Sequence, residues 1–393
     1  MRFMHLADLH IGKVLNGFSL IEDQRFALAQ LVDYAAAQKL DAIVLAGDLY
    51  DKAAPSAEAV ALLDELFTRI AATGIPCLAI PGNHDSADRV GYVSGLLAHE
   101  GIHVPARYDG TVAHVELADE YGPVVFWLLP FLKPAQVRPY FPDDDIGSDY
   151  TAALASALSA CDVDPAERNV LVAHQNVSYA GRGPIRSDSE FSVGGLDNVD
   201  ATAFDAFDYV ALGHIHRPQR IGRDTVRYAG SLLKYSLSEI RYPKSACIVT
   251  LGPKGQCSVD LHPITPLHDL REISGPLDKL CGDDVVAGQD ADDYLSVVLT
   301  DEEPRIDALG RLRAHYPNVM TVSYAFEREH AAEAPVASED GASDDLALDP
   351  LALFERFFEQ QTGAALSADQ RAIAKTELER ACEQDFTDEG RRA

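Results

Sequence analysis

Residues of the kinds that bind metal ions follow one short apolar run after another in this sequence. The runs lie at 3–7, 42–46, 77–80, 124–129, 170–173 and 209–212. Each is too short for a typical helix, and several are apolar at consecutive positions, as in strands buried on both faces. In open α/β sheets, ligands bind outside the carboxyl ends of the strands. We therefore expect one site to collect the residues that follow these runs, namely Asp8, His10, Asp48, Asn83, His174, His214 and His216.

Segments of helical spacing between the runs indicate an α/β organisation. Residues 25–38 and 56–72 are such segments, and Ser56 is placed to cap the second. The alternation continues to about residue 260, which is typical of βα units and predicts a first domain over 1–263. A smaller α/β domain is expected over 264–330, with strands at 293–299 and 319–326 and a helix at 306–315.

The C-terminal region changes character twice. Residues 331–349 are acidic and poor in apolar side chains, which predicts a flexible linker. Residues 350–386 predict a pair of amphipathic helices, in which Ser367 and Gln370 fit a capping box. The first helix carries an apolar stripe of Leu351, Phe354, Phe357 and Phe358. A helix pair this short has no core of its own, so it packs back on the body or docks on another protein.

The charge balance limits the possible partners. The 62 acidic residues against 33 basic residues leave a net charge of −29, which argues against a free-standing nucleic-acid binder. If the chain handles phosphate, bound cations or a partner must supply positive charge. The six cysteines form no Cys-x-x-Cys pair, which argues against a cysteine zinc site and a disulfide framework. Neither a secretory pattern nor an apolar run of roughly 20 residues is present, so a cytoplasmic protein is expected.

The donor types define the expected chemistry. Carboxylate, amide and imidazole groups without a thiolate favour manganese, iron or zinc ions. Seven donors are more than one tetrahedral ion uses, and if Asp48 bridges, they divide into two sets of four, as in two-metal hydrolytic sites. Glycine beside the ligands, at 47, 82 and 213, allows tight turns and close backbone approach. His5 lies inside the first run and is interpreted as a packed core imidazole.

The combined motifs resemble those of the calcineurin-like metallophosphoesterases. They are Asp8-x-His10, Gly47-Asp48, Gly82-Asn83-His84-Asp85, His174 and Gly213-His214-x-His216. Residues 7–12, 46–51, 193–195, 214–219 and 229–236 are similar to the nuclease members that work with an ATPase subunit in bacterial DNA repair. The resemblance implies an α/β sandwich of two central sheets flanked by helices, with a small α/β capping domain and a C-terminal helix pair.

The resemblance also implies a role for each site residue. One ion would be held by Asp8, His10, Asp48 and His216, and the other by Asp48, Asn83, His174 and His214. Both ions would be divalent, with manganese preferred. His84 would orient the phosphate or protonate the leaving oxygen. Asp85 would hold the tautomer of the His84 ring, although a role as a turn residue is equally open.

The function implied is manganese-dependent hydrolysis of DNA. It comprises 3′–5′ exonuclease activity on duplex ends and endonuclease activity on single strands and hairpins, in DNA repair and recombination. The partners implied are the ATPase subunit, which the C-terminal helix pair would dock, and a second copy of this chain in a heterotetramer at the nucleoid. A phosphoesterase acting on small nucleotide or phosphodiester substrates is the alternative, and an interaction protein with a structural site is a third possibility.

Overall fold

The computed structural model describes residues 1–105, 107–188, 190, 197–286, 290–326, 354–355, 358, 365–367 and 370–375. Residues 1–329 form one compact unit and residues 330–393 a second. The domain boundary predicted at 263/264 lies inside the first unit, between strands β16 and β17. That boundary, and the linker and helix pair at 331–386, therefore stay predictions.

The first large sheet is built on β1, whose two neighbours lie far apart in sequence. Its strand order is β16-β15-β1-β4-β5-β6. Strand β1 runs parallel to β4, with Phe3 opposite Ala42, and antiparallel to β15, with Phe3 opposite Val249. The strands are β1 (Arg2–Leu6), β4 (Ala42–Ala46), β5 (Cys77–Ile80), β6 (Ile102–His103), β15 (Ser245–Leu251) and β16 (Cys257–Pro263). The three predicted runs at 3–7, 42–46 and 77–80 are thus confirmed as strands.

The second large sheet has the order β13-β14-β12-β9-β8-β7. Its central strands β8, β9 and β12 are parallel and contain the other three predicted runs. The strands are β7 (Ala113–Asp119), β8 (Gly122–Leu129), β9 (Arg168–His174), β12 (Tyr209–Gly213), β13 (Gln219–Ile221) and β14 (Arg223–Tyr228). Two small ribbons pair β2 (Val14–Leu15) with β3 (Phe18–Ser19), and β10 (Asn176–Ser178) with β11 (Asn198–Asp200).

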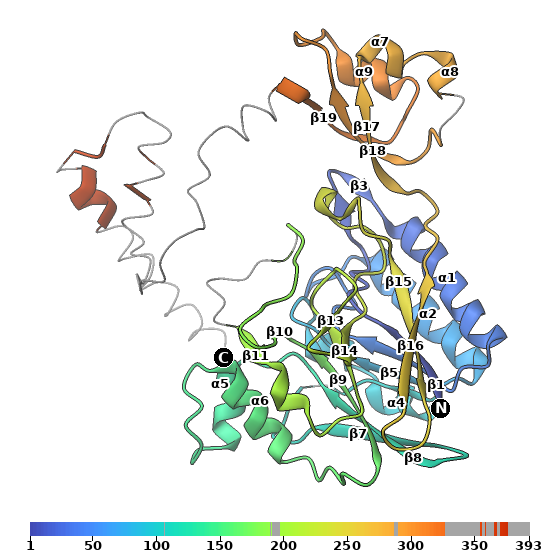
Figure 1. Ribbon diagram of the computed structural model, residues 1–393, viewed down its shortest axis with the longest axis vertical. Helices are drawn as coiled ribbons and strands as arrows, with labels where there is room; N and C mark the ends of the chain where they lie inside the picture. The colour runs from blue at the N-terminus through green and yellow to red at the C-terminus, as the bar shows by residue number, and fades with distance from the viewer. Residues whose placement is uncertain are drawn as a thin grey trace. The chain divides into compact units, whose positions relative to one another are not determined.

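The two sheets pack face to face and are covered by helices on their outer sides (Figure 1). The core between them joins Phe3, Val44 and Leu78 of the first sheet to Phe126 and Val172 of the second. The helices of this body are α1 (Ile21–Ala37), α2 (Ala57–Thr73), α3 (Ala87–Val90), α4 (Ser94–His99), α5 (Pro134–Val137) and α6 (Tyr150–Ser159), with 3₁₀ turns η1 (Arg138–Tyr140), η2 (Ala201–Phe204) and η3 (Leu237–Glu239). This is the expected α/β sandwich, so the predicted fold class is confirmed.

Helix α2 shows how local sequence sets an element. The Ser56 side chain accepts a hydrogen bond from the Ala59 N–H at 3.2 Å, as predicted for the N-cap. Gly74 ends the helix with a φ of 73°, in the left-handed region that favours glycine. Between them, Leu62, Leu66 and Ile70 recur at helical spacing and pack on the outer face of the first sheet.

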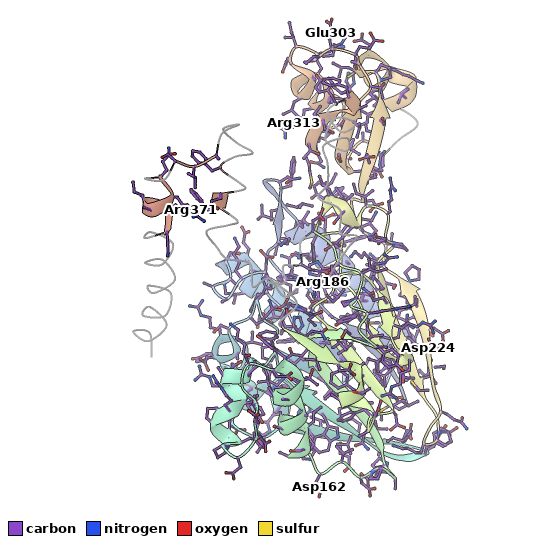
Figure 2. The ribbon with its side chains drawn as sticks, turned by 60° about the vertical axis from the view of Figure 1, so that its left-hand side comes forward. Asp162, Arg186, Asp224, Glu303, Arg313 and Arg371 are labelled. Carbon is purple, nitrogen blue, oxygen red and sulfur yellow. The ribbon has the colours of Figure 1, made fainter. Side chains whose placement is uncertain are left out.

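The small α/β part, on which Figure 2 labels Glu303 and Arg313, has its own core. That core lies around Leu295, Leu312 and Tyr316. The elements of this part are β17 (Leu270–Gly275), α7 (Leu277–Leu280), α8 (Asp283–Val286), β18 (Tyr294–Leu299), α9 (Ala308–Arg313) and β19 (Val319–Tyr324), with all three strands parallel in the order β17-β18-β19. It contacts α1 through Asp23, whose carboxylate accepts hydrogen bonds from the Tyr294 hydroxyl at 2.8 Å and from His268 Nδ1 at 3.0 Å.

The C-terminal unit is described at a few residues. Ser367 and Gln370 form the predicted capping box, with N–H to side-chain oxygen distances of 2.9 and 3.3 Å. Phe354 and Phe358, two members of the predicted stripe, have ring centroids 6.4 Å apart. The other two members, Leu351 and Phe357, and the linker at 331–349 lie outside the described residues. Within the described residues, no helix is both long and apolar enough to span a membrane.

Candidate metal centre

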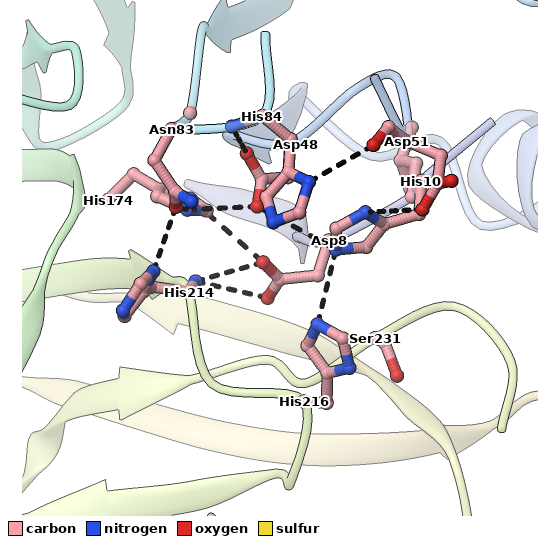
Figure 3. Close-up of polar contacts among 12 residues, drawn as sticks. Asp8, His10, Asp48, Asp51, Asn83, His84, His174, His214, His216 and Ser231 are labelled. Atoms are coloured by element: carbon pink, nitrogen blue, oxygen red, sulfur yellow. Dashed lines mark hydrogen bonds and ion pairs between the residues drawn. The ribbon is translucent and has the colours of Figure 1, made fainter. Parts of the chain in front are cut away.

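All seven predicted ligands meet between the carboxyl ends of the two large sheets (Figure 3). The first sheet contributes Asp8 and His10 after β1, Asp48 after β4 and Asn83 after β5, and the second contributes His174 at the end of β9 and His214 and His216 after β12. Asp8, His10, Asp48, His174 and His216 are buried, with at most 4% of each residue exposed. Strand ends far apart in the sequence thus bring all seven candidate ligands together, and metal binding by them stays a prediction.

The backbone at the site is held in an unusual conformation. Asp8, His10, Asp48 and His214 have φ values of 51°, 43°, 50° and 102°, in a region that residues other than glycine rarely adopt. Two cross-strand hydrogen bonds hold the loops there: the Asp8 N–H donates to the Gly47 carbonyl at 3.1 Å and the His10 N–H to the Asp48 carbonyl at 2.9 Å. Such strain persists where the surrounding structure enforces it, and it gathers at functional sites.

Two glycines let the sheets approach each other at the site. A Cβ atom on Gly213 would lie 1.9 Å from the Ala46 carbonyl oxygen, and one on Gly47 would lie 2.2 Å from His174 Nδ1. Gly47 also has a φ of 89°. These contacts confirm the prediction that glycine beside the ligands permits close backbone approach.

His10 and His216 face each other through their Nε2 atoms, 3.1 Å apart. On the far side of each ring a carboxylate faces Nδ1: Glu239 Oε1 lies 3.3 Å from His216, and Asp51 Oδ1 lies 3.5 Å from His10. A proton on each Nδ1 suits these carboxylates and leaves a lone pair on each Nε2. Two lone pairs this close repel each other, whereas a cation beside them would bind both. The pair therefore fits a metal site.

His174, in the second half of the site, is also held at Nδ1 and has its Nε2 near other donor atoms. Its Nδ1 lies 2.9 Å from the Ala46 carbonyl, which accepts a hydrogen bond and places the proton there. Its Nε2 lies 3.0 Å from Asn83 Oδ1 and 3.3 Å from Asp48 Oδ2. Asn83 Oδ1 is also 2.9 Å from His214 Nδ1. Oxygen and imidazole donors turned toward one point fit a divalent cation.

Burial and neighbouring charged groups shift the pKa values of Asp8, Asp48 and His174, and the directions differ. Burial raises the pKa of Asp8 to about 7, and the nearby Asp48 carboxylate adds to this effect. Burial also opposes ionisation of Asp48, but His174 and the other imidazoles hold the pKa of Asp48 well below its usual range. Burial lowers the pKa of His174, yet the two aspartates outweigh it and raise that pKa to about 9. A proton on His174 thus supplies the positive charge that a metal ion would supply, and metal binding would release it.

His84 lies at the edge of the site, while the Asp85 side chain binds backbone N–H groups. The His84 ring contacts the His10 ring edge-on, and its Nδ1 lies 3.0 Å from the Asp51 carbonyl oxygen. The Asp85 carboxylate accepts hydrogen bonds from the N–H groups of Leu49, Tyr50 and Gly82, each at 2.9 Å. The expectation that Asp85 holds the His84 ring is therefore wrong, because the Asp85 carboxylate is bound by three backbone N–H groups instead. The alternative expectation, that Asp85 is a turn residue, agrees with these contacts.

Three residues behind the ligands are absent from the sequence prediction. Gln24 of α1 is fully buried and donates to the carbonyl oxygens of Leu9 and His10, at 3.1 and 2.7 Å. Glu239 and Lys244 form a buried ion pair behind His216, with an Nζ to Oε2 distance of 2.6 Å. No local spacing marks any of the three, and each stands among other polar or charged residues, so the sequence offers no signal for them.

The comparisons with known proteins agree with this site. Residues 1–218 match the family described as Calcineurin-like phosphoesterase. The chain therefore belongs to the calcineurin-like phosphoesterases, and its buried oxygen and imidazole donors make it a metal-dependent member. It is similar to the SbcD subunit of the nuclease SbcCD from Staphylococcus epidermidis, with 32% identity over 328 residues that cover 82% of this chain and 85% of the relative. Residues 266–362 match the family described as Type 5 capsule protein repressor C-terminal domain.

Two solved structures align with this chain at low similarity. A dimetal phosphatase from Danio rerio aligns over 67% of this chain and 96% of its own, with a TM-score of 0.43 and 12% identity. TT1561 of Thermus thermophilus aligns over 66% of this chain and 98% of its own, with a TM-score of 0.38 and 15% identity. Similarity at this level carries no information about the substrate of this chain.

Proposed function

We propose that this chain is a manganese-dependent DNA nuclease that hydrolyses phosphodiester bonds at a two-ion site. The observation that carries the proposal is the pair of imidazole Nε2 atoms of His10 and His216, which face each other at 3.1 Å beside buried carboxylates. The likeness to a relative named as part of a nuclease supports DNA as the substrate. The proposed activities are exonuclease cleavage of duplex ends in the 3′–5′ direction and endonuclease cleavage of single strands and hairpins.

The proposed ligand sets follow the two halves of the site. Asp8, His10, Asp48 and His216 would hold one ion, and Asp48, Asn83, His174 and His214 the other. Support comes from three groups of donor atoms that each lie within 4.8 Å of one another: Asp8 with His10 and His216, His10 with Asp48 and His84, and Asp8 with Asp48 and His174. Asp48 Oδ2 lies 3.6 Å from His10 Nε2 and 3.3 Å from His174 Nε2, near both proposed ligand sets, as a bridging carboxylate would.

His84 is proposed to handle the proton of the reaction. When bound, the two ions polarise the scissile phosphate and lower the pKa of a bound water. His84 Nδ1 donates to the Asp51 carbonyl, which fixes the ring, and in its imidazolium form the Nε2–H would pass its proton to the departing 3′ oxygen and leave the neutral ring. Asp85 acts on this step only indirectly, by holding the loop that carries His84 against residues 49 and 50.

The proposed partners are an SbcC-type ATPase, DNA and a second copy of this chain, in a heterotetramer that serves DNA repair and recombination in the cytoplasm, at the nucleoid. The C-terminal helix pair at 350–386 would dock the ATPase through the stripe that includes Phe354 and Phe358, and the part at 264–330 would cap the nuclease domain at 1–263.

A second copy of this chain would cover an apolar surface on α4 and the turn before it. Tyr92 and Leu96 on this surface are 80% and 71% exposed.

The decisive experiment is manganese-dependent cleavage of an end-labelled hairpin duplex by the purified chain and by its His84→Ala variant, with and without SbcC and ATP. We expect the wild-type chain to cleave and the variant to lose about 100-fold or more in rate, since general acid–base groups contribute roughly 10² to 10⁴. A requirement for SbcC would locate DNA engagement in the partner.

The metal content of the same samples serves as the control. If both proteins bind two ions per chain and neither cleaves DNA under any of these conditions, the site survives and the DNA assignment does not. Cleavage of nucleotide or cyclic phosphodiesters by such a sample would then favour the small-substrate phosphoesterase.

A further inference from the structure

Behind His216 lies a cluster of charged and polar side chains sealed from solvent. Glu239, Lys244 and Ser231 are exposed by 0%, 6% and 1%. The Glu239 carboxylate contacts His216 Nδ1 through Oε1 at 3.3 Å, and accepts from Lys244 Nζ at 2.6 Å through Oε2. Lys244 Nζ donates its other two hydrogens to Ser231 Oγ at 2.7 Å and to the His216 carbonyl oxygen at 2.8 Å. All three ammonium donors are therefore used.

This cluster holds both the ring and the backbone of His216. Glu239 fixes the ring through Nδ1, while Lys244 and the Ser231 N–H, at 3.1 Å, fix the carbonyl oxygen. On the other side of the residue, Glu190 Oε1 accepts from the His216 N–H at 2.6 Å. The direction of Nε2, toward His10, is set by all of these contacts together.

Burying an ion pair is costly, and a well-packed apolar pair of similar size is often as stable. Fold stability alone therefore gives weak grounds for charges at 239 and 244. Their place directly behind a candidate ligand gives a more specific reason. A carboxylate behind a ligating histidine fixes its tautomer and makes the imidazole a stronger donor.

The other half of the site provides an internal comparison. His174 is held in the same way at Nδ1, but by the neutral carbonyl of Ala46 at 2.9 Å. Both rings are thus oriented with Nε2 toward the centre of the site. Asp8 Oδ1 lies 4.0 Å from His174 Nδ1, but the hydrogen-bond acceptor there is the Ala46 carbonyl, whereas the acceptor behind His216 is the Glu239 carboxylate. The cation beside Asp8, His10 and His216 is therefore the one that should sense a change at 239.

We propose that Glu239, with its charge balanced by Lys244, is a positioning residue that presents the His216 Nε2 lone pair to the cation held with Asp8 and His10. The inference rests on the proposed two-ion site and deepens it. Glu239 touches neither substrate nor reacting atoms in this scheme; it acts through His216.

The test is cation binding by the full chain, measured by calorimetry with Mn²⁺ and by the visible absorption of bound Co²⁺. In Glu239→Gln we expect affinity for one of the two cations to fall by about 10- to 100-fold, the usual effect of removing such a partner. The Co²⁺ spectrum of that cation should change, and the second cation should bind as in the wild type.

A second variant separates positioning from folding, because Glu239→Gln leaves Lys244 buried and unpaired. Glu239→Gln with Lys244→Met removes both charges and should recover the thermal stability of the metal-free chain. We expect its weakened cation to stay weak. Asp23→Asn is the matched control: Asp23 is a 2% exposed carboxylate that also contacts a histidine Nδ1, that of His268 at 3.0 Å, away from the site. Its cation binding should equal that of the wild type.

Recovery of wild-type affinity for both cations in the double variant would overturn the proposal, because the pair would then be needed for folding alone. Unchanged binding in Glu239→Gln would overturn it too. The number of cations bound by the wild type distinguishes this failure from failure of the proposed function. If the wild type binds two cations and Glu239→Gln binds them equally well, only the positioning role is removed. If the wild type binds fewer than two, the two-ion site is removed and the inference with it.

Discussion

His5, in the middle of β1, gives the chain a measurable sensitivity to acid. The imidazole is fully buried between the sheets, with Nδ1 2.9 Å from the Tyr209 hydroxyl and Nε2 3.2 Å from the Leu212 carbonyl oxygen. One neutral tautomer satisfies both contacts, because Nε2 donates and Nδ1 accepts. Burial lowers the pKa of His5 from 6.5 to about 3, so this ring stays neutral in the folded chain at pH values where the unfolded chain takes up a proton.

The size of the effect follows from linkage. Because the unfolded chain binds the proton first, folding stability falls as the pH drops below 6.5, and the loss is complete only near pH 3. Between pH 7 and pH 5 this one group should reduce the free energy of unfolding by about 2 kcal/mol, at about 1.4 kcal/mol per pH unit below the unfolded pKa. The His5→Gln variant can keep both hydrogen bonds but does not titrate, so it should lack this part of the pH dependence.

The assay is urea unfolding of the chelated chain at pH 7 and pH 5, followed by the fluorescence of Trp127. This is the single tryptophan of the chain and is buried in β8 of the second sheet. The matched control is His99→Gln, which removes an exposed imidazole at the end of α4. An equal pH dependence in the wild type and in His5→Gln would refute the reasoning, because it would mean that the buried ring gains its proton without cost.

Four further outcomes follow from the site and the charge balance. Asp85→Ala should lower the free energy of unfolding by about 3 kcal/mol in urea titrations, since three backbone N–H groups lose a charged acceptor. Asp85→Asn should lower the free energy of unfolding by less, and equal decreases in the two variants would contradict this account. Chelation should lower the melting temperature, and Mn²⁺ at about 100 times its Kd should restore about 2.7 kcal/mol; a melting temperature indifferent to both would argue against a built cation site. The metal-free chain, with a net charge of −29, should bind duplex DNA weakly in a salt titration; tight, salt-sensitive binding would refute this. Deleting residues 350–393 should abolish co-elution with SbcC but leave Mn²⁺-dependent hydrolysis of bis-p-nitrophenyl phosphate unchanged; retained co-elution would remove the docking role.

The central strands could be predicted because they are buried on both faces. Runs such as 42–46 and 170–173 are apolar at every position, so the pattern needs no knowledge of their neighbours. The outer strands are different: β7 and β16 alternate between half-buried and exposed positions, and β13 has only three residues. Their pairing depends on contacts across the chain, which no local pattern reveals.

The same distinction, between what a local pattern reveals and what only tertiary packing reveals, separates the candidate ligands from the residues behind them. Asp8, Asp48 and His174 could be predicted because each follows a strand or ends one, and strand order brings such positions together. Glu239 and Gln24 come from a short turn and from a helix, and only tertiary packing brings them to the site. The error at Asp85 has a related cause: sequence proximity to His84 suggested a contact between the side chains, whereas two of its three donors were amides 35 and 36 residues away.

The position of β1 between β4 and β15 has a consequence for the order of events during synthesis. The site takes Asp8, Asp48 and Asn83 from one sheet and His174, His214 and His216 from the other, so neither sheet alone carries both proposed ligand sets. The first sheet is itself incomplete until β15 and β16 have emerged from the ribosome, long after its N-terminal strands. A nascent chain arrested anywhere before residue 216 lacks a ligand, and one arrested before residue 245 lacks a strand beside β1. Hydrolytic competence therefore arises only when nearly the whole phosphoesterase body has been made.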